Sequence, residues 1–187
     1  QEKDGDYFDV LNNAAKDIPA GSDGVLFLPY LTGGTNDVKE ATGCFLNMTL
    51  DTDQATLWHA VLEAIGYDYM EITDLYRGAG VDMSCITITE GGSRSEIWNQ
   101  MKSDMLGSEV ITLKNAGGAV VTDCIVGAYA LGHITDMKAA LTESLEIKKL
   151  YYTNAENHDF YAKQYALQKK LVKQDMKEAF HTLKALH

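Results

Sequence analysis

The chain is poor in cysteine, proline and positive charge, and it has no long apolar run. Its cysteines, Cys44, Cys85 and Cys124, are odd in number and far apart. This excludes a disulfide framework and a metal site of regular ligand spacing. We expect reduced, largely buried cysteines in a cytoplasmic protein. Two prolines beside 16 glycines favour a compact α/β chain with tight turns over a linker.

The shortage of positive charge leaves a formal net charge of −11. Such a charge argues against a nucleic-acid partner, which usually meets a basic face. No apolar stretch is long enough to span a bilayer, and no secretory signal is visible at the start, so we expect no membrane partner. The 187 residues suffice for one domain with a sizeable core. Because the first residue is not Met, we expect the natural start to lie upstream.

The most informative stretch runs from Cys85 to Asp104. Residues 85–89 are rich in β-branched side chains and predict a strand. A turn at Gly91-Gly92 follows, and then a helix with apolar residues at helical spacing. Ser93 and Glu96 fit the capping-box pattern at the start of that helix. Such a unit can cradle an anion, because free N–H groups face the ligand and glycine permits close approach. A plain structural turn is the alternative.

The remaining elements follow from periodicity and turn residues. Strands are predicted at 25–30, 43–50 and 110–113, and helices at 7–15, 53–77, 118–132, 136–145 and 157–186. In the 53–77 helix we expect the core stripe to be Leu57, Val61, Ile65, Tyr69 and Ile72. Gly127 and Ala128 inside the 118–132 helix predict that it lies close against a sheet or a second backbone.

Three further polar features have two interpretations each. The Gly33-Gly34 pair could approach a phosphate or belong to a surface loop. Glu63 could be a functional carboxylate, although a solvated or capping acid is the expectation. His59 is expected to be a packing or surface histidine and not a catalyst.

Several motifs, read in order, resemble one known family. They are Gly24-Val25-Leu26-Phe27-Leu28-Pro29-Tyr30-Leu31, Gly43-Cys44-Phe45, residues Leu57 to Glu63, residues Gly91 to Gln100, Ser103-Asp104, and Gly117-Gly118-Ala119. Together they are similar to the C-terminal half of the FGGY carbohydrate kinases, and the xylulokinase branch in particular. The resemblance covers nearly the whole chain.

The resemblance implies an α/β, ribonuclease-H-like fold, shared with actin, hexokinase and heat-shock ATPases. It also implies transfer of the ATP γ-phosphoryl group to a sugar hydroxyl, with Mg²⁺ assisting and an aspartate as base. Positioning and charge neutralisation dominate such a reaction. The nucleotide contacts it implies are Gly91, Gly92, Ser93, Ser95, Gln100, Gly117 and Gly118. Trp98 matches a family aromatic that packs.

The family's catalytic aspartate, Mg²⁺ ligands, second phosphate hairpin and sugar pocket lie before this chain begins. The resemblance therefore implies that residues 1–187 are the ATP-side domain, without the N-terminal half. We expect no catalytic or metal-ligating residue in the chain and no activity alone. ATP or ADP would bind here, and sugar through the missing half. The sheet would lack its first strands, and a homodimer that covers the exposed edge is a further expectation.

Two other functions compete with this one. Gly33-Gly34 stands where xylulokinases carry Gly-Glu-Arg, and that departure favours a non-catalytic nucleotide-binding or assembly module of the same fold. A dinucleotide-dependent oxidoreductase is disfavoured, because Gly91-Gly92 does not extend to a spaced three-glycine fingerprint.

Overall fold

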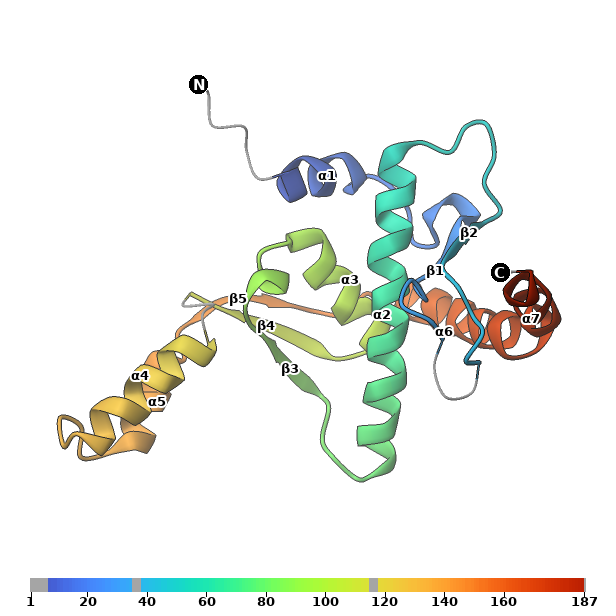
Figure 1. Ribbon diagram of the computed structural model, residues 1–187. Helices are drawn as coiled ribbons and strands as arrows, with labels where there is room; N and C mark the ends of the chain where they lie inside the picture. The colour runs from blue at the N-terminus through green and yellow to red at the C-terminus, as the bar shows by residue number, and fades with distance from the viewer. Residues whose placement is uncertain (1–6, 35–37, 115–117, 187) are drawn as a thin grey trace, which may run out of the picture.

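The computed structural model describes residues 7–34, 38–114 and 118–186 (Figure 1). Its helices are α1 Tyr7–Ala15, α2 Gln54–Gly78, α3 Glu96–Leu106, α4 Gly118–Ala130, α5 Met137–Ser144, α6 Ala155–Lys170 and α7 Lys177–Ala185. Its strands are β1 Leu26–Leu28, β2 Cys44–Leu46, β3 Cys85–Ile88, β4 Glu109–Leu113 and β5 Ile147–Tyr151. The predicted α/β class is therefore confirmed.

Two small sheets are present among the described residues. Strands β1 and β2 pair antiparallel, with Phe27 opposite Phe45. The second sheet has the order β3-β4-β5, with β3 parallel to β4 and β4 antiparallel to β5. Among the described strands, β3 has a neighbour on one side only. The expected incomplete sheet is therefore confirmed. Strand β5 was not predicted, because its two lysines and exposed faces hide the alternation that marks a strand.

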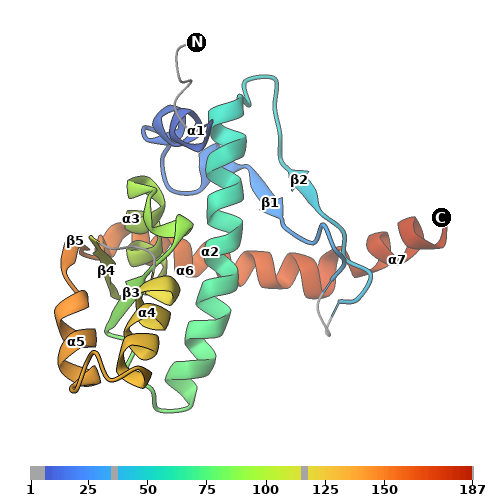
Figure 2. The ribbon, with the colours of Figure 1, turned by 60° about the vertical axis from the view of Figure 1, so that its left-hand side comes forward.

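Helix α2 stands at the centre of the packing, with α3 on one side and α6 crossing it (Figures 1 and 2). In the main core, Tyr67 of α2 stacks on Tyr165 of α6 with ring centroids 6.1 Å apart. Met105 of α3 is fully buried against Gly66, where a Cβ atom would lie 2.2 Å from the methionine sulfur. Glycine at this position therefore lets the two helices approach closely. A smaller core joins β1 to α2 through Val25, Phe27, Ala60 and Ala64.

The bounds of α2 agree with the prediction, but its buried face does not. Asp53 caps the helix, since its carboxylate accepts from the Thr56 N–H at 2.8 Å. Of the expected stripe, Leu57, Val61 and Ile65 are only half-buried, and Tyr69 and Ile72 are exposed. The buried face also carries four polar side chains, namely Thr56, His59, Glu63 and Thr73. Leu57 and Val61 thus reach only the margin of the smaller core, and the fully buried face lies beside the predicted stripe.

The C-terminal helix is broken where one continuous helix was predicted. A π-helical turn at Leu171–Asp175 separates α6 from α7, and the Met176 N–H donates to the Leu171 carbonyl at 2.8 Å. A π turn adds a residue to the helical turn and so rotates the following face. As a result Phe180 is buried, whereas Leu183, three residues further along the helix, is 55% exposed.

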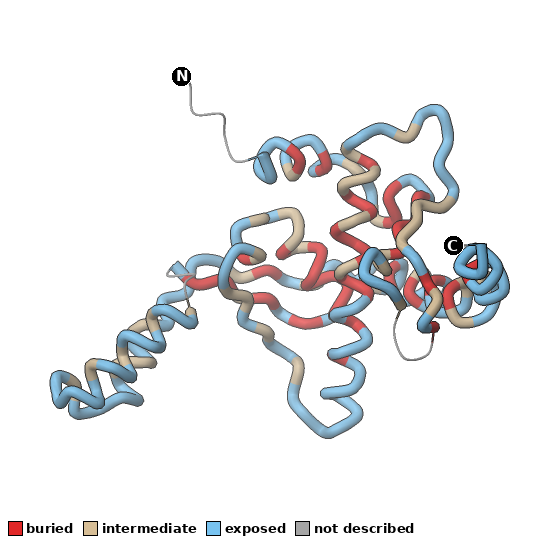
Figure 3. Tube along the Cα trace, viewed as in Figure 1, coloured by how far each residue is buried: buried red, intermediate tan, exposed pale blue. Residues whose placement is uncertain are grey.

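Helices α4 and α5 lie side by side and project from the body of the molecule (Figures 2 and 3). Of the two neighbours predicted for this helix, a sheet or a second backbone, α4 has the second, since it lies against α5, but Gly127 is not at that contact. None of its residues is buried, and a Cβ atom at Gly127 would meet nothing within 4 Å. Cys124 in α4 and Cys85 in β3 are also exposed, which corrects the expectation of largely buried cysteines. Within the described residues, no helix is both long and apolar enough to cross a membrane.

Replacing Met105 with alanine should destabilise the fold. The side chain is fully buried between α2 and α3, so its removal leaves a cavity that costs about 2–5 kcal/mol. The measurement is the free energy of unfolding from urea denaturation followed by circular dichroism. Met48→Ala is the matched control, because Met48 is 52% exposed and should change stability by less than about 0.5 kcal/mol. Equal effects of the two substitutions would contradict the packing described above.

Candidate functional site

Strands β3 and β4 bring two turns of the chain to the same edge of the sheet. The strands are parallel, so their carboxyl ends meet at one edge, where α/β sheets commonly bind ligands. The Gly91-Gly92 turn follows β3, and α4 begins at Gly118 shortly after β4. A Cβ atom at Gly118 would lie 3.2 Å from the Thr89 side chain, so the small residue permits close approach. Gly117 lies outside the described residues.

A cavity of about 630 Å³ lies at this edge of the sheet and is lined by Gly118 and Ala119 of the second turn. One wall is the face of β3 at Thr87 and Thr89, and Leu113 of β4 adds to it. The first turns of α4 and the end of α5 form the opposite wall. Its size lies within the range of small-molecule pockets, roughly 300–1,000 Å³. Its lining mixes apolar side chains with a few hydroxyls and the carboxylate of Asp123.

The Gly91-Gly92 turn is held from within by hydrogen bonds to its carbonyl groups. Ser93 is buried, and its hydroxyl donates to the Glu90 carbonyl at 2.7 Å. The Asn99 side-chain amide donates to the Ser93 carbonyl at 2.7 Å. Lys102 donates from Nζ to the Gly92 carbonyl at 3.0 Å. The turn is therefore fixed by side chains that α3 supplies.

The cap of α3 differs from the prediction. Residues Gly91–Ser93 form a 3-10 turn, so the helix itself begins only at Glu96. Ser95 is the N-cap, and its hydroxyl accepts from the Trp98 N–H at 3.3 Å. The predicted capping box of Ser93 and Glu96 is wrong, since Ser93 bonds within the turn. The Glu96 carboxylate instead pairs with Lys149 of β5 at 2.9 Å.

Glu90 has a backbone conformation that residues other than glycine rarely adopt. Its φ is 61° and its ψ is −157°, a region occupied almost only by glycine, at a cost of about 1–3 kcal/mol for other residues. Its carboxylate accepts from the Ala119 N–H in the first turn of α4 at 3.3 Å. Glu90 thus connects the two turns directly. Sequence analysis missed this residue, because backbone conformation is not visible in a residue type.

Lys102 was also missed by sequence analysis. Its side chain is 1% exposed, and Nζ lies 3.8 Å from the centroid of the Trp98 ring. Burial lowers the pKa of the Lys102 ammonium to about 8. The available signal was its spacing, since Lys102 falls between Trp98 and Met105 on the helix face that points inward.

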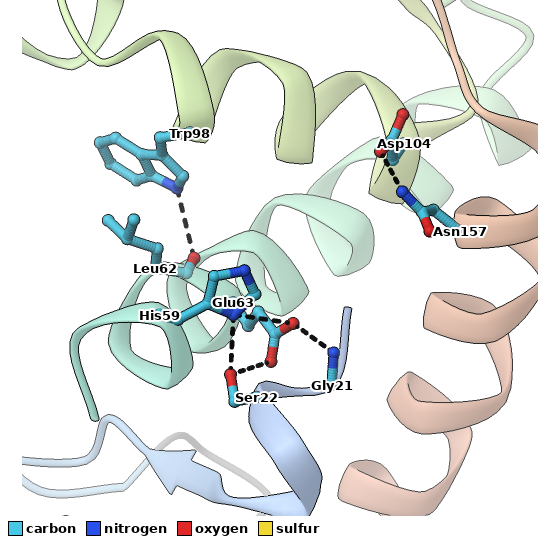
Figure 4. A network of polar contacts seen from close by, with 8 residues as sticks. All are labelled: Gly21, Ser22, His59, Leu62, Glu63, Trp98, Asp104 and Asn157. Atoms are coloured by element: carbon cyan, nitrogen blue, oxygen red, sulfur yellow. Dashed lines mark hydrogen bonds and ion pairs between the residues drawn. The ribbon is translucent and has the colours of Figure 1, made fainter. Parts of the chain in front are cut away.

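Gln100 is the predicted contact that the structure does not bring to the turn. Its Nε2 atom donates to Asp104 Oδ1 and to the Tyr152 carbonyl, both at 2.8 Å. Gln100 lines a second cavity of about 570 Å³ together with Lys149 and other residues. Side chains two residues apart on an α-helix are rotated by about 200° about the helix axis. Gln100 and Lys102 therefore lie on opposite faces of α3. Trp98 packs as expected, and its Nε1 donates to the Leu62 carbonyl at 3.2 Å (Figure 4).

A second polar cluster lies between α2 and the turn at residues 21–24 (Figure 4). Glu63 is 1% exposed, and its carboxylate accepts from the Gly21 N–H at 2.7 Å and from the Ser22 hydroxyl at 2.8 Å. His59 Nδ1 lies 2.9 Å from the same hydroxyl. The expectation of a solvated or capping acid at Glu63 is therefore wrong. The buried position of His59 agrees with the expected packing role.

The order of these side chains differs from that of a hydrolytic triad. In such a triad histidine bridges serine and acid, whereas here Ser22 lies between His59 and Glu63. The Ser22 hydroxyl donates to Glu63, so it accepts from the Nδ1–H tautomer of neutral His59. Ser22 is also fully buried, with φ at 51°. The cluster therefore holds a left-handed turn against α2 and offers no accessible nucleophile.

The 3.4 Å contact between His59 and Glu63 is not an ion pair near neutral pH. Burial lowers the pKa of His59 to about 4. Burial also raises the pKa of Glu63 to about 7, although its hydrogen bonds to Gly21 and Ser22 oppose the shift. Between about pH 4 and pH 7 both side chains are therefore mainly neutral.

The Gly33-Gly34 pair has a local structural explanation. A Cβ atom at Gly34 would lie 1.6 Å from the Val38 carbonyl oxygen, and φ at Gly33 is 102°. The glycines are thus required by the bend of the chain, which favours the surface-loop interpretation. Among the described residues, no group of three His, Cys, Asp or Glu side chains could hold a metal ion.

The arrangement of helices and sheets is that of solved sugar kinases. The structure of ligand-bound xylulose kinase from Lactobacillus acidophilus matches with a TM-score of 0.74 at 21% sequence identity, over 92% of this chain and 35% of that chain. At this identity the likeness shows the fold, which is the expected ribonuclease-H-like fold of actin and hexokinase.

Sequence comparison then gives the family. The model of the C-terminal domain of the FGGY family of carbohydrate kinases matches residues 1–131, so the chain belongs to this family. Xylulose kinase of Staphylococcus epidermidis (strain ATCC 12228) is 29% identical over 169 residues, 89% of this chain and 34% of its own length. Gluconokinase of Bacillus subtilis is 33% identical over 140 residues, which are 72% of this chain and 27% of its own length. The chain thus spans about a third of the length of these relatives.

Glu63 should make stability depend on pH. Its folded pKa of about 7 lies above its ordinary value of 4.5, so the folded state retains a proton that the unfolded chain releases. The contribution of Glu63 to the free energy of unfolding is fully present below pH 4.5 and is lost as the pH rises from 4.5 through 7. His59 acts in the opposite direction, since its pKa is lowered from 6.5 to about 4 and stability falls as pH drops through that window.

Glu63→Gln should remove the Glu63 contribution alone. Relative to the unmodified protein, this variant should become more stable by up to about 3 kcal/mol between pH 5 and pH 8, at roughly 1.4 kcal/mol per pKa unit. Urea denaturation at several pH values measures this difference. Glu178→Gln, at an exposed position of α7, is the control and should show no such trend. A stability difference independent of pH would contradict the pKa shift.

Proposed function

We propose that this chain is the C-terminal, ATP-side half of a sugar kinase that transfers the ATP γ-phosphoryl group to a sugar hydroxyl. The proposal rests chiefly on the cavity that the end of β3 and the first turn of α4 line together, because the Gly91-Gly92 turn follows Thr89 of this lining by two residues. The cavity has the size of a nucleoside site, and the turn offers backbone N–H groups for a phosphate. Membership of a carbohydrate kinase family supports the same conclusion.

D-xylulose is the sugar that we propose, because relatives named xylulose kinase cover most of the chain. Relatives named gluconokinase define the competing substrate. The sugar, the catalytic aspartate and the Mg²⁺ ligands would belong to the upstream half. Residues 1–187 are thus proposed as one ATP-side domain of a cytoplasmic enzyme, inactive alone. The free edge of β3 would meet the missing strands, or a second copy of the chain in a homodimer.

The residues predicted to contact the nucleotide have different roles in this proposal. Gly91 and Gly92 let the nucleotide approach the backbone, and Gly118 does the same at the start of α4. Ser93 fixes the turn from within, and Ser95 caps α3. Gln100 holds the connection between β5 and α6, since it donates to the Tyr152 carbonyl. In this proposal it does not contact the nucleotide. Gly117 stays a prediction from the resemblance.

Gly91→Ala tests the site without disturbing the protein. A Cβ atom at Gly91 would meet no other described atom within 4 Å, so the fold should accept it, whereas it would occupy space beside a bound nucleotide. We expect the dissociation constant for ADP, measured by calorimetry, to rise at least about tenfold, equivalent to about 1.4 kcal/mol. The ATP KM of the enzyme with its upstream half should rise in parallel.

Gly78→Ala is the matched control for this test. Gly78 ends α2, and a Cβ atom there also meets nothing within 4 Å. It should leave ADP binding unchanged. If the unmodified chain does not bind ADP, and Gly91→Ala leaves the ATP KM of the joined enzyme unchanged, the proposed site is wrong.

A second candidate function is a non-catalytic module of the same fold, and Glu90 favours it. Its carboxylate lies at the first turn of α4, a position where an anionic ligand is otherwise favoured. A negative charge there opposes a nucleotide phosphate. In this alternative the unmodified chain binds no ADP, and the turn serves only to hold α4.

Glu90→Gly separates the two candidates. Glycine removes the charge and relieves the backbone strain at φ 61°. If the chain is a kinase half, ADP should bind before the substitution and about fivefold more tightly after it, as expected for a like charge near 4 Å in water. Glu90→Gln, which removes the charge but keeps the strain, should give most of the gain. ADP binding that appears only in Glu90→Gly would favour the non-catalytic module.

A further inference from the structure

Lys102 is a buried cation without a carboxylate partner among the described residues. No Asp or Glu of the described chain forms an ion pair with it. Its Nζ atom has the Gly92 carbonyl at 3.0 Å, Asn99 Oδ1 at 3.4 Å and the Trp98 ring at 3.8 Å. These contacts use the donors of the ammonium but do not neutralise its charge. Burial of an unpaired charge is costly, so stability alone does not explain a lysine here.

The contacts of Lys102 and Asn99 set the direction of the turn's peptide groups. The carbonyls of Gly92 and Ser93 point to these two side chains. The Gly91 carbonyl accepts from the Arg94 N–H, and the Glu90 carbonyl accepts from Ser93. In a planar trans peptide the N–H points opposite to the C=O.

The N–H groups of Gly91 and Gly92 belong to the peptides whose carbonyls, those of Glu90 and Gly91, accept from the Ser93 and Arg94 N–H groups. They therefore point away from those two internal hydrogen bonds. No described residue accepts a hydrogen bond from either of them. Successive free N–H groups form a concave site for an anionic oxygen. The ammonium of Lys102 lies beside the turn, in a buried position where solvent screens its charge only weakly.

We propose that Lys102 is a positioning residue for a phosphate group of the nucleotide: it holds the Gly92 carbonyl, keeps the Ser93 N–H on the Glu90 carbonyl so that the Gly91 N–H stays turned outward, and places a positive charge beside the turn. This inference rests on the proposed nucleotide site. It goes beyond that site in giving Lys102, a residue outside the predicted contacts, a role toward the phosphate. A lysine that served packing alone would be replaceable by methionine with no effect on ligands.

The test compares ADP, adenosine and two substitutions in the full 187-residue chain. Lys102→Met removes the charge and the donor at similar length, and Lys102→Gln keeps a donor but no charge. We expect Lys102→Met to weaken ADP binding about tenfold or more, equivalent to at least about 1.4 kcal/mol. Lys102→Gln should weaken it less. Adenosine, which has no phosphate, should bind all forms equally, and the melting temperature should not fall with either substitution.

Lys177→Met is the control, since Lys177 is an exposed lysine of α7. It should leave ADP binding within about twofold. If Lys102→Met also stays within twofold while Gly91→Ala abolishes binding, the nucleotide site stands and the role of Lys102 is overturned. Equal weakening of ADP and adenosine would overturn it as well, because the effect would then be on the fold of the site. If Lys102→Met does not fold, the Lys102→Gln comparison decides alone. Failure of the unmodified chain to bind ADP would overturn the site and this inference together.

Discussion

The packing of helix α3 on helix α2 is the constraint on which the candidate site depends. The Trp98 indole donates to the Leu62 carbonyl near one end of the contact, and Met105 fills the space over Gly66 near the other. Between these points α3 carries Asn99 and Lys102, whose side chains hold the carbonyls of the Gly91-Gly92 turn. The core and the site are therefore one arrangement, and a shift of α3 would move both.

The strand, the glycine pair and the helix of this unit could be predicted from sequence, because each has a local signal. β-branched residues mark β3, glycine marks the turn, and apolar spacing marks α3. The cap of α3 could not be placed by the same means. The Ser-x-x-Glu pattern fits Ser93 and Glu96, yet the chain uses residues 91–93 for a 3-10 turn before the helix begins. Both Ser93 and Ser95 could cap the helix, and the conformation of the 91–93 turn determines that Ser95 does so.

Burial of polar side chains was the main property that sequence could not give. Glu63 is buried because the Gly21 N–H and the Ser22 hydroxyl, some 40 positions earlier, satisfy its carboxylate. Without knowledge of those partners, Glu63 looks like a surface residue, and the apolar stripe beside it looks like the core. Lys102 was missed for the same reason. The π turn after α6 has no sequence signal either, and it decided that Phe180 and not Leu183 is buried.

The charge balance of the chain bears on how it would bind an anion. With a net charge of −11, its long-range field repels nucleotides. Charges more than about 8 Å away are largely screened at physiological ionic strength, whereas buried charges are screened much less. Binding must therefore depend on groups at the turn itself. There Lys102 contacts the Gly92 carbonyl and Glu90 contacts the first turn of α4, so two opposite charges on either side of the Gly91-Gly92 turn set the local potential. Their balance, more than the net charge, determines whether the turn accepts a phosphate.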